Sequence, residues 1–251
     1  MKALHAELDA WAATGRKPVF WWRDDDATAD LASLRRLLDL REASGLPLAL
    51  AVIPALIEES LPPLLAGQEG LCLLQHGYAH ENHAPPDRKK RELGDERPLE
   101  AVLAELKAGK ARGEAFFGAA WLPILVPPWN RIAPAVAAAL PGLGFAGLST
   151  HGRAPTPPPG LLQVNSHLDI MEWKPRTRFR GEGAVLADLC AELAARRTDE
   201  RGAPHEPLGL LTHHLAHDEA AWNFLEKLLS DPHVKEMVSW KPASGLFSRH
   251  V

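Results

Sequence analysis

Three adjacent carboxylates, Asp24, Asp25 and Asp26, follow the apolar run 18–23. Carboxylates this close repel one another and are costly to hold beside an apolar strand unless a cation offsets their charge. The alternative is a solvated turn in which one aspartate caps a helix, a role that aspartate often fills. The run is therefore a candidate cation site that needs support from elsewhere in the chain.

Two histidines, His76 and His80, follow the apolar run 71–75. Residues four apart lie on one face of a helical turn, where two imidazoles can reach one ion. A single histidine here would be interpreted as a hydrogen-bonded structural residue, whereas a pair at this spacing favours a metal-binding role. His83 comes one step later and is interpreted as a surface residue rather than a substrate contact.

Two more histidines, His213 and His214, end the apolar run 208–211. Imidazole is the usual proton donor near neutral pH. Because successive side chains of a strand point to opposite faces, only one of the two can enter a shared site. Histidines at strand ends are often only structural, so these residues alone leave the active one open.

Together these groups predict one kind of chemistry. Two histidines and a carboxylate form a facial triad that leaves coordination positions open for water and substrate. A divalent ion held there lowers the pKa of bound water and polarises a carbonyl. A second carboxylate can then act as the base and a distant histidine as the acid. The set predicts a metal-assisted acyl hydrolase.

The elements that must bring these groups together alternate between strands and helices. Apolar runs predict seven strands, at 18–23, 48–53, 71–75, 122–126, 145–149, 161–164 and 208–211. Helical spacing occurs near the N-terminus and around 31–40, 100–117, 134–140, 184–196 and 219–229. This alternation is typical of parallel β/α units, which gather functional residues at the carboxyl ends of their strands. With no interior linker, it favours one incomplete barrel over residues 1–251 rather than two domains.

Composition narrows the class of protein further. The 251-residue chain is 46% hydrophobic, and its net charge of −4 gives no electrostatic case for nucleic acid or an anionic membrane surface. Cys72 and Cys190 are too few for a disulfide framework and fit a reducing compartment. No apolar run resembles a secretory signal or a membrane span, so we expect a cytoplasmic protein. The segment 84–97 is expected to be an exposed loop and the proline-rich stretch 153–160 a surface connection.

The order of these motifs resembles the polysaccharide deacetylase family (NodB-like, carbohydrate esterase family 4). The family's paired aspartates resemble Asp25-Asp26, and its H-x-x-x-H metal motif matches His76 and His80. Its third motif is similar to Val126-Pro127-Pro128-Trp129, its D-x-x-D-W motif to Asp169-Ile170-Met171-Glu172-Trp173, and its final L-x-H to Leu211-Thr212-His213. These five motifs keep the family's order from residue 20 to about 215, which is most of the chain.

The resemblance implies a distorted (β/α)7 barrel and a metal-dependent deacetylase, a hydrolase acting on non-peptide carbon–nitrogen bonds. It implies Asp25 as general base and His213 as general acid. It implies Asp26, His76 and His80 as ligands of a divalent metal, Zn²⁺ before Co²⁺, Ni²⁺ or Fe²⁺. The backbone N–H of Trp129 would help to stabilise the oxyanion.

Three departures from the family pattern stand out. The extra Asp24 leaves the working pair open between Asp24-Asp25 and Asp25-Asp26, although Ala27, where the family has glycine, favours the second. Val126 replaces the arginine that orients the base, and Arg23 or Arg131 could take over that role. Glu172 stands in place of an aspartate.

The expected substrate is an N-acetylated or O-acetylated sugar or glycan precursor. Flat indole faces suit sugar rings, so we expect Trp129 and Trp173 to line the pocket, and the other tryptophans that lie away from the motifs to pack in the core. Asp169, Asn130 and His214 are further expected to contact substrate. If the match to L-x-H places His213 in the site, His214 lies on the opposite face of the strand and would instead pack against the helix layer or hydrogen-bond a neighbouring loop.

Two other functions remain open. A degenerate barrel that binds a metal or a glycan without turnover would fit the missing arginine at position 126. Another metal-dependent barrel, such as an amidohydrolase, would usually carry H-x-H after its first strand, where this chain has three aspartates. Metal content measured together with hydrolysis of an acetyl ester separates the binding-only barrel from the enzyme.

Overall fold

The computed structural model describes residues 1–153, 157–199 and 206–248. Its strands are β1 Val19–Ala27, β2 Leu48–Val52, β3 Leu71–His76, β4 Trp121–Val126, β5 Gly147–Leu148, β6 Leu162–Gln163, β7 Leu168–Asp169, β8 Met171–Glu172, β9 Arg178–Phe179, β10 Leu208–Thr212 and β11 Ser239–Trp240. Its α-helices are α1 Lys2–Ala12, α2 Ala32–Ser44, α3 Leu61–Leu65, α4 Leu99–Phe117, α5 Pro134–Ala139, α6 Glu182–Arg197, α7 Glu219–Ser230, α8 Pro232–Met237 and α9 Ala243–Leu246.

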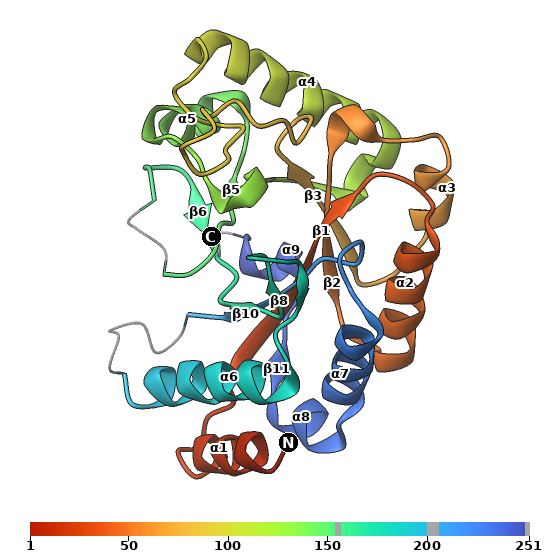
Figure 1. Ribbon diagram of the computed structural model, residues 1–251, viewed down its shortest axis with the longest axis vertical. Helices are drawn as coiled ribbons and strands as arrows, with labels where there is room; N and C mark the ends of the chain where they lie inside the picture. The colour runs from red at the N-terminus through yellow and green to blue at the C-terminus, as the bar shows by residue number, and fades with distance from the viewer. Residues whose placement is uncertain (154–156, 200–205, 249–251) are drawn as a thin grey trace.

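The strands form a curled sheet with helices around it (Figure 1). Among the described residues this sheet has nine strands, in the order β6-β5-β4-β3-β2-β1-β10-β7, with β11 beside β1. Every pair in it is parallel, so the strands end at one edge. β8 and β9 form a separate antiparallel hairpin. The distorted, incomplete α/β barrel predicted from the sequence is confirmed.

All seven predicted strands are present, and their ends differ from the expectation. β1 continues through the three aspartates to Ala27 instead of ending at Arg23, so these carboxylates belong to the strand and not to a turn after it. β5 and β6 have only two residues each, and the unpredicted β7 and β11 are as short. A two-residue strand carries no periodicity, so its position depends on pairing with neighbours rather than on local sequence.

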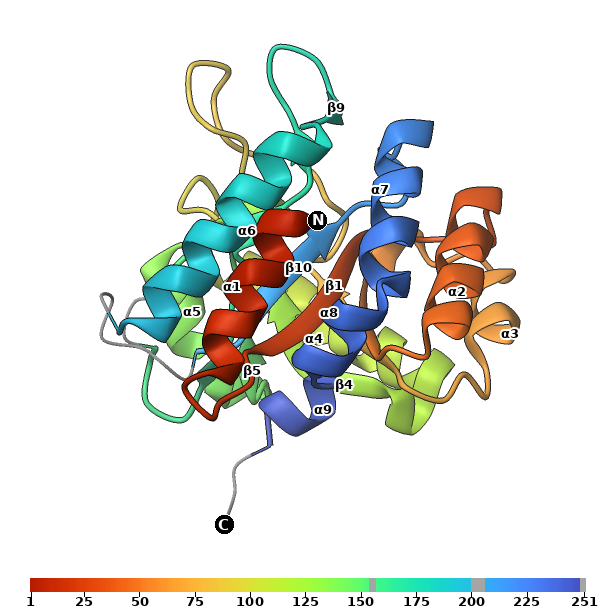
Figure 2. The same ribbon diagram turned by 90° about the horizontal axis from the view of Figure 1, so that it is seen from below.

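Apolar side chains fill both faces of the sheet. On the outer face a large core packs β1, β2 and β10 against α1, α2, α6, α7 and α8, and Figure 2 shows α1 lying beside α6. Inside the curl, Trp21, Ala51 and Leu74 meet Ala243 and Phe247 near the C-terminus. β2 is buried at all five positions, as expected for a central parallel strand covered on both faces.

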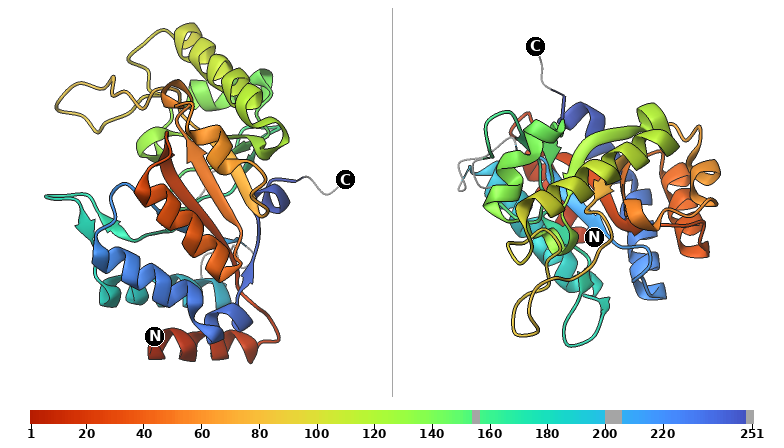
Figure 3. Two further views of the ribbon diagram at one scale, coloured as in Figure 1. Left: turned by 90° about the vertical axis from the view of Figure 1, so that its right-hand side faces the viewer. Right: turned by 90° about the horizontal axis from the view of Figure 1, so that it is seen from above.

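The segment between β3 and α4 departs from the exposed loop that the sequence predicts. It does project from the same side of the molecule as the β8–β9 hairpin (Figure 3). However, Glu92, Leu93 and Gly94 are buried, and Leu93 pairs with Ile132 in an isolated bridge. Of the proline-rich connection 153–160, residues 154–156 lie outside the described residues. In the described part of the chain, no helix combines the length and apolar character needed to cross a bilayer.

Candidate metal centre and acid–base pair

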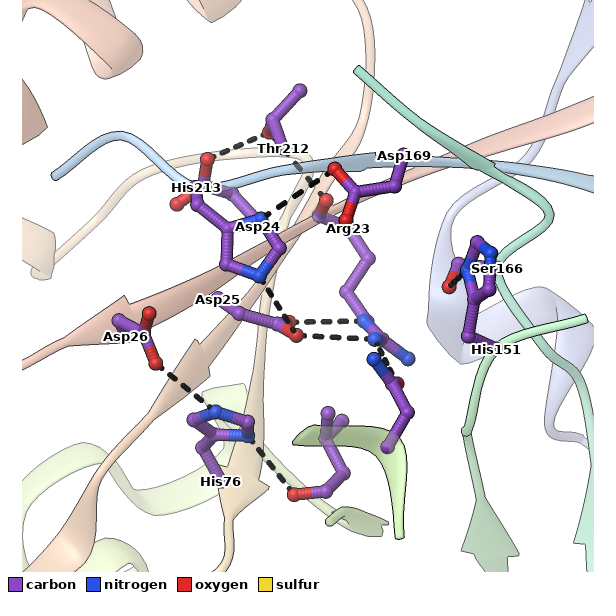
Figure 4. A network of polar contacts seen from close by, with 12 residues as sticks. Arg23, Asp24, Asp25, Asp26, His76, His151, Ser166, Asp169, Thr212 and His213 are labelled. Atoms are coloured by element: carbon purple, nitrogen blue, oxygen red, sulfur yellow. Dashed lines mark hydrogen bonds and ion pairs between the residues drawn. The ribbon is translucent and has the colours of Figure 1, made fainter. Parts of the chain in front are cut away.

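The predicted chemical groups meet at the carboxyl edge of the sheet. Asp25 and Asp26 come from β1, His76 from the end of β3, and His213 from the residue after β10 (Figure 4). β3 and β10 lie near β1 on opposite sides, since β10 pairs with β1 directly and β3 is separated from it by β2. Parallel topology thus collects side chains that are far apart in the sequence.

Strand geometry separates the three adjacent aspartates. Arg23 and Asp25 share one face of β1, while Asp24 lies on the other and is fully buried. Asp26 has a φ of 77°, and the pairing of β1 with β2 shifts register between Asp24 and Ala27. This irregularity brings the Asp26 carboxylate to His76. The three carboxylates therefore occupy three environments instead of repelling one another in one.

Asp26, His76 and His80 form the candidate metal centre. Asp26 Oδ1 lies 3.1 Å from Nε2 of His76 and 3.4 Å from Nε2 of His80. His76 Nδ1 lies 3.0 Å from the carbonyl oxygen of Val126, and a hydrogen bond donated there directs Nε2 into the site. One ligand atom from each of the three residues lies within 4.8 Å of the others. One carboxylate and two imidazoles are the donors that Zn²⁺ and related divalent ions prefer.

Burial and charge also suit a cation here. Asp26 Oδ1 is buried and makes no well-aligned hydrogen bond among the described residues. Burial alone would raise the pKa of Asp26, but contact with His76 and its charge outweigh burial and lower that pKa, so the carboxylate is ionised. Burial and the nearby His76 lower the pKa of His80, which favours the neutral imidazole that binds metals. The residues present fit a divalent cation.

The pKa of His76 shifts in the opposite direction from that of His80. Burial acts to lower the pKa of His76, but the contact with Asp26 and the charges of Asp25 and Asp26 outweigh it and raise that pKa. A proton on Nε2 and a metal ion would compete for the same lone pair, so an ion bound here would displace that proton.

The connection from His76 to His80 is not the helical turn expected from the i, i+4 spacing. No residue of 77–80 is helical, and Gly77 and His80 have positive φ values of 56° and 58°. A Cβ at Gly77 would lie 1.9 Å from an oxygen of Glu92 and 2.6 Å from Pro128, so only glycine fits. An open turn, rather than a helix face, brings the two imidazoles together.

Arg23 holds the Asp25 carboxylate from inside the sheet. Its Nε lies 2.9 Å from Asp25 Oδ1, and its Nη2 donates to Asp25 Oδ2 at 3.0 Å. Arg23 is itself fully buried and is fixed by Asn130 Oδ1 at 2.7 Å and by Ser149 Oγ at 2.7 Å. The carboxylate is thus gripped at both oxygens by a guanidinium that has little freedom to move.

This contact bears on the position where the resemblance expects an arginine and the chain has Val126. Val126, at the family's position, is fully buried in the apolar interior of the curl. Arg131, the other candidate, donates from Nη1 to the carbonyl oxygen of Lys90 at 2.7 Å. Of the two alternatives that the sequence leaves open, the structure places Arg23 against Asp25.

His213 faces Asp25 across the site. His213 Nε2 lies 3.9 Å from Asp25 Oδ2, and its Nδ1 lies 3.9 Å from Asp169 Oδ1. Trp173 meets the imidazole edge-on, with ring centroids 4.6 Å apart, and donates from Nε1 to Asp169 Oδ2 at 2.8 Å. The backbone N–H of His213 donates to His217 Nε2 at 3.3 Å. Asp169 therefore lies beside the His213 ring and accepts a hydrogen bond from Trp173.

His214 points away from the site, as strand alternation requires. It is 1% exposed, and its Nδ1 lies 2.5 Å from Asp24 Oδ1. Its backbone N–H and the Thr212 hydroxyl both donate to Asp24 Oδ2. The expected substrate contact of His214 is therefore wrong, because the side chain is enclosed behind the sheet.

The turn that follows β4 places Trp129 beside the metal centre. Trp129 and Asn130 have consecutive positive φ values of 54° and 56°. The Trp129 ring lies 4.4 Å from the His80 ring, and Lys90 lies over it at 5.8 Å. Asn130, expected to bind substrate, instead accepts a hydrogen bond from Arg23. Its side chain therefore contacts Arg23, which in turn contacts Asp25.

A cavity of about 470 Å³ adjoins the far side of Asp169. It is lined by the described residues His151, His167, Asp169, Met171, Glu172, Arg180, Ala184 and Asp188. His151 is held by Ser166 Oγ at 3.0 Å, and burial lowers its pKa. Sequence reasoning did not single out His151 or Arg180, since neither belongs to a motif or an apolar run. The lining combines histidine and arginine side chains with carboxylates.

Comparison with known proteins gives a likeness in structure only. No family model and no curated protein matches the sequence. Among solved structures, the chain is similar to a Mycobacterium smegmatis protein assigned to the polysaccharide deacetylases, with a TM-score of 0.65, 14% identity and coverage of 92% of this chain and 90% of that one. It is also similar to the peptidoglycan deacetylase PdaC from Bacillus subtilis, with a TM-score of 0.59, 12% identity and coverage of 92% and 90%.

A third similar structure is a family 4 acetyl xylan esterase from Clostridium thermocellum in complex with a cobalt ion. Its TM-score is 0.55, with 13% identity and coverage of 91% of this chain and 90% of that one. Identities this low establish the fold and nothing finer. The chain has the fold of the polysaccharide deacetylases, whose sequence motifs its own motifs resemble.

Proposed function

We propose that the protein is a metal-dependent deacetylase that removes an N-acetyl or O-acetyl group from a sugar or glycan precursor. The observation that carries the proposal is the convergence of Asp26, His76 and His80 beside Asp25, with His213 facing Asp25 from across the site. A ligand set with open positions next to a base and an acid is what acyl hydrolysis requires. The fold shared with solved deacetylases and an acetyl xylan esterase adds support.

Asp26, His76 and His80 would hold the ion, which supplies a Lewis acid for the acyl carbonyl and lowers the pKa of water. Asp25 takes the proton from the attacking water, and the contacts of Arg23 with both of its oxygens hold the carboxylate in place. His213 donates a proton to the leaving nitrogen or oxygen, with Asp169 beside its Nδ1 to hold the ring.

The backbone N–H of Trp129 is the proposed oxyanion donor, because its turn lies against the metal centre. Trp173 is 45% exposed beside His213 and offers an indole face to a sugar ring. The cavity beyond Asp169 gives room for further hydroxyl groups of the substrate. We keep Trp173 and Asp169 as proposed substrate contacts and assign Asn130 to the support of Arg23.

The binding-only alternative loses its argument from the missing arginine, because Arg23 contacts Asp25 in its place. An amidohydrolase is disfavoured by the metal set, in which β1 provides a carboxylate rather than two histidines. The test is elemental analysis of the purified protein, together with acetate release from N-acetylated glucosamine oligomers and from 4-nitrophenyl acetate. Asp25→Asn should retain the ion and lose about 10²–10⁴-fold in rate. An ion bound at full occupancy without release of acetate from any of these substrates would support the binding-only barrel.

A further inference from the structure

Glu92 is a buried carboxylate that none of the motifs contains. It lies in the segment between β3 and α4 and is 1% exposed. Its Oε1 accepts a hydrogen bond from the backbone N–H of Ala79 at 2.7 Å, and its Oε2 accepts one from the N–H of Tyr78 at 3.1 Å. Tyr78 and Ala79 are two of the three residues that join His76 to His80. One side chain therefore binds the middle of the turn that carries both histidine ligands.

The turn needs an external support because it has no helical hydrogen bonds of its own. Besides Glu92, the described residues hold its backbone only around Gly77 and Tyr78: Gly77 N–H donates to Val126 O at 3.0 Å, Gln75 Nε2 donates to Gly77 O at 3.0 Å, and Ala55 N–H donates to Tyr78 O at 2.8 Å. Two successive N–H groups that point at one anion form a backbone nest. An ionised acceptor makes such hydrogen bonds shorter and stronger than neutral ones. Glu92 supplies that acceptor.

Glu92 is itself held from the side of the Trp129 turn. The adjacent Leu93 is fully buried, and its carbonyl oxygen accepts a hydrogen bond from Ala133 N–H at 2.7 Å. Two residues before Glu92, the carbonyl oxygen of Lys90 accepts from Arg131 Nη1 at 2.7 Å. The segment thus joins the histidine turn to the turn that carries the proposed oxyanion donor.

We propose that Glu92 is a positioning residue for the metal centre, which sets the affinity for the divalent ion by fixing the approach of His80 to Asp26 and His76. This inference rests on the proposed metal site. Glu92 does not contact the ion but holds the backbone of a ligand in its binding conformation. Outer residues of this kind change metal affinity by about 10–100-fold when they are replaced.

The test is titration of the metal-free full-length protein with Co²⁺, followed by its visible absorption, and with Zn²⁺ in competition with a chromophoric chelator. Glu92→Gln should weaken both affinities by about 10–100-fold, because the amide removes the charge and turns a donor toward an N–H group. Glu92→Asp keeps the charge on a shorter side chain, so its affinities for the two ions should lie between those of the wild type and of Glu92→Gln. This variant still tests the inference if Glu92→Gln does not fold. Asp95→Asn is the matched control, since Asp95 lies in the same segment with its side chain 75% exposed, and it should bind like the wild type.

The outcomes separate this inference from the proposed function. If Glu92→Gln and Glu92→Asp bind Co²⁺ with wild-type affinity and spectrum while only their metal-free forms melt earlier, Glu92 merely orders the segment and the inference is wrong. If the wild type itself takes up no ion, and Asp26→Asn behaves identically, the metal site fails and the inference fails with it. Weaker ion binding by a Glu92 variant, together with wild-type binding by Asp95→Asn, supports both the metal site and the positioning role of Glu92.

Discussion

The guanidinium of Arg23 meets both carboxylate oxygens of Asp25, two residues further along the same strand, with nitrogen–oxygen distances of 2.9 and 3.0 Å. Both side chains are buried, so the pair is removed from solvent screening. Strand periodicity explains the contact, because residues i and i+2 share a face. The proposed base and a cation that contacts both of its oxygens therefore lie within three residues of one strand.

This pair gives the first prediction. Arg23→Lys keeps the positive charge but loses the planar fork that spans both oxygens. Since Arg23 acts through Asp25 and not on substrate, kcat for acetyl release should fall about 10–100-fold while KM stays nearly constant. Steady-state kinetics on 4-nitrophenyl acetate and on an N-acetylated sugar measures both constants.

Arg35→Lys is the control, because Arg35 is exposed and pairs with Asp30 away from Asp25. It should leave kcat and KM close to the wild type. An Arg23→Lys enzyme with unchanged kcat and a raised KM would instead mean that Arg23 binds substrate directly.

Removal of the ion is the second prediction. Chelation should lower the melting temperature of the wild type and leave Asp26→Asn unaffected, since an ion that binds only the folded state stabilises it by about 2.7 kcal/mol at 100 times its Kd. For a chain of this length, that corresponds to roughly 5–10 °C. Differential scanning fluorimetry with and without chelator measures the shift. Equal shifts in wild type and Asp26→Asn would place the ion elsewhere in the protein.

The sequence predicts that Asp26, His76 and His80 meet at one edge of the sheet, because they follow strands whose apolar runs are long enough to recognise. His76 and Asp26 each end such a run, and parallel strands bring their ends to one edge. The contact of Arg23 with Asp25 was also within reach, since a strand that continues through the aspartates puts both on one face. A strand predicted to end at Arg23 does not place Arg23 and Asp25 on one face, so Arg131 remains an equal alternative from the sequence alone.

Glu92 shows what sequence reasoning could not find. Its segment is charged and rich in turn formers, which indicates an exposed loop, yet a buried Leu93 anchors it to the residues that follow β4. No local pattern marks which of its acidic residues folds inward. The same holds for the open turn from His76 to His80, whose conformation depends on Glu92 and Pro128 rather than on the i, i+4 spacing.

His217 gives the third prediction, on stability against pH. Burial lowers its pKa to about 4, with the nearby His213 and His214 adding to the effect and Asp24 and Asp169 opposing it. The folded state therefore keeps His217 neutral where the unfolded chain, with a pKa near ~6.5, takes up a proton. Stability is fully present above about pH 6.5 and is lost as the pH falls toward about 4, by about 1–2 kcal/mol between pH 7.5 and 5.

Urea unfolding of wild type and His217→Gln at pH 7.5 and 5 tests this prediction. Other titrating groups contribute to both proteins, so the difference between the two pH slopes isolates His217. Glutamine offers an acceptor oxygen to the N–H of His213 and does not titrate, so the variant should lose less stability on acidification. Identical slopes would show that His217 does not titrate differently in the folded state.

The fourth prediction rests on the opposite environments of two adjacent histidines. His213 opens onto Asp25 and Asp169, whereas His214 is enclosed with Asp24 behind the sheet. For Asp24, burial acts to raise the pKa, but the charge and hydrogen bond of His214 outweigh it and lower that pKa, so the carboxylate is ionised. Removing the imidazole of His214 leaves a buried charge without its partner, which typically costs about 3–5 kcal/mol.

Replacing each histidine by alanine should therefore produce different kinds of damage. His213→Ala should lose hydrolysis of an acetamide, whose amine leaving group needs a proton, yet keep part of its activity on 4-nitrophenyl acetate, whose leaving group does not. Its melting temperature should change less than that of His214→Ala, because His213 lies no closer than 3.9 Å to Asp25 and Asp169 and leaves no tightly bound charge behind. His214→Ala should instead unfold at lower temperature or lower urea and, where folded, keep the ratio of amide to ester activity of the wild type. Parallel measurement of that ratio and of urea unfolding separates the two roles. If His214→Ala lost amide activity selectively while His213→Ala kept it, the general acid would be His214, and the face assignment along β10 would have to be reversed.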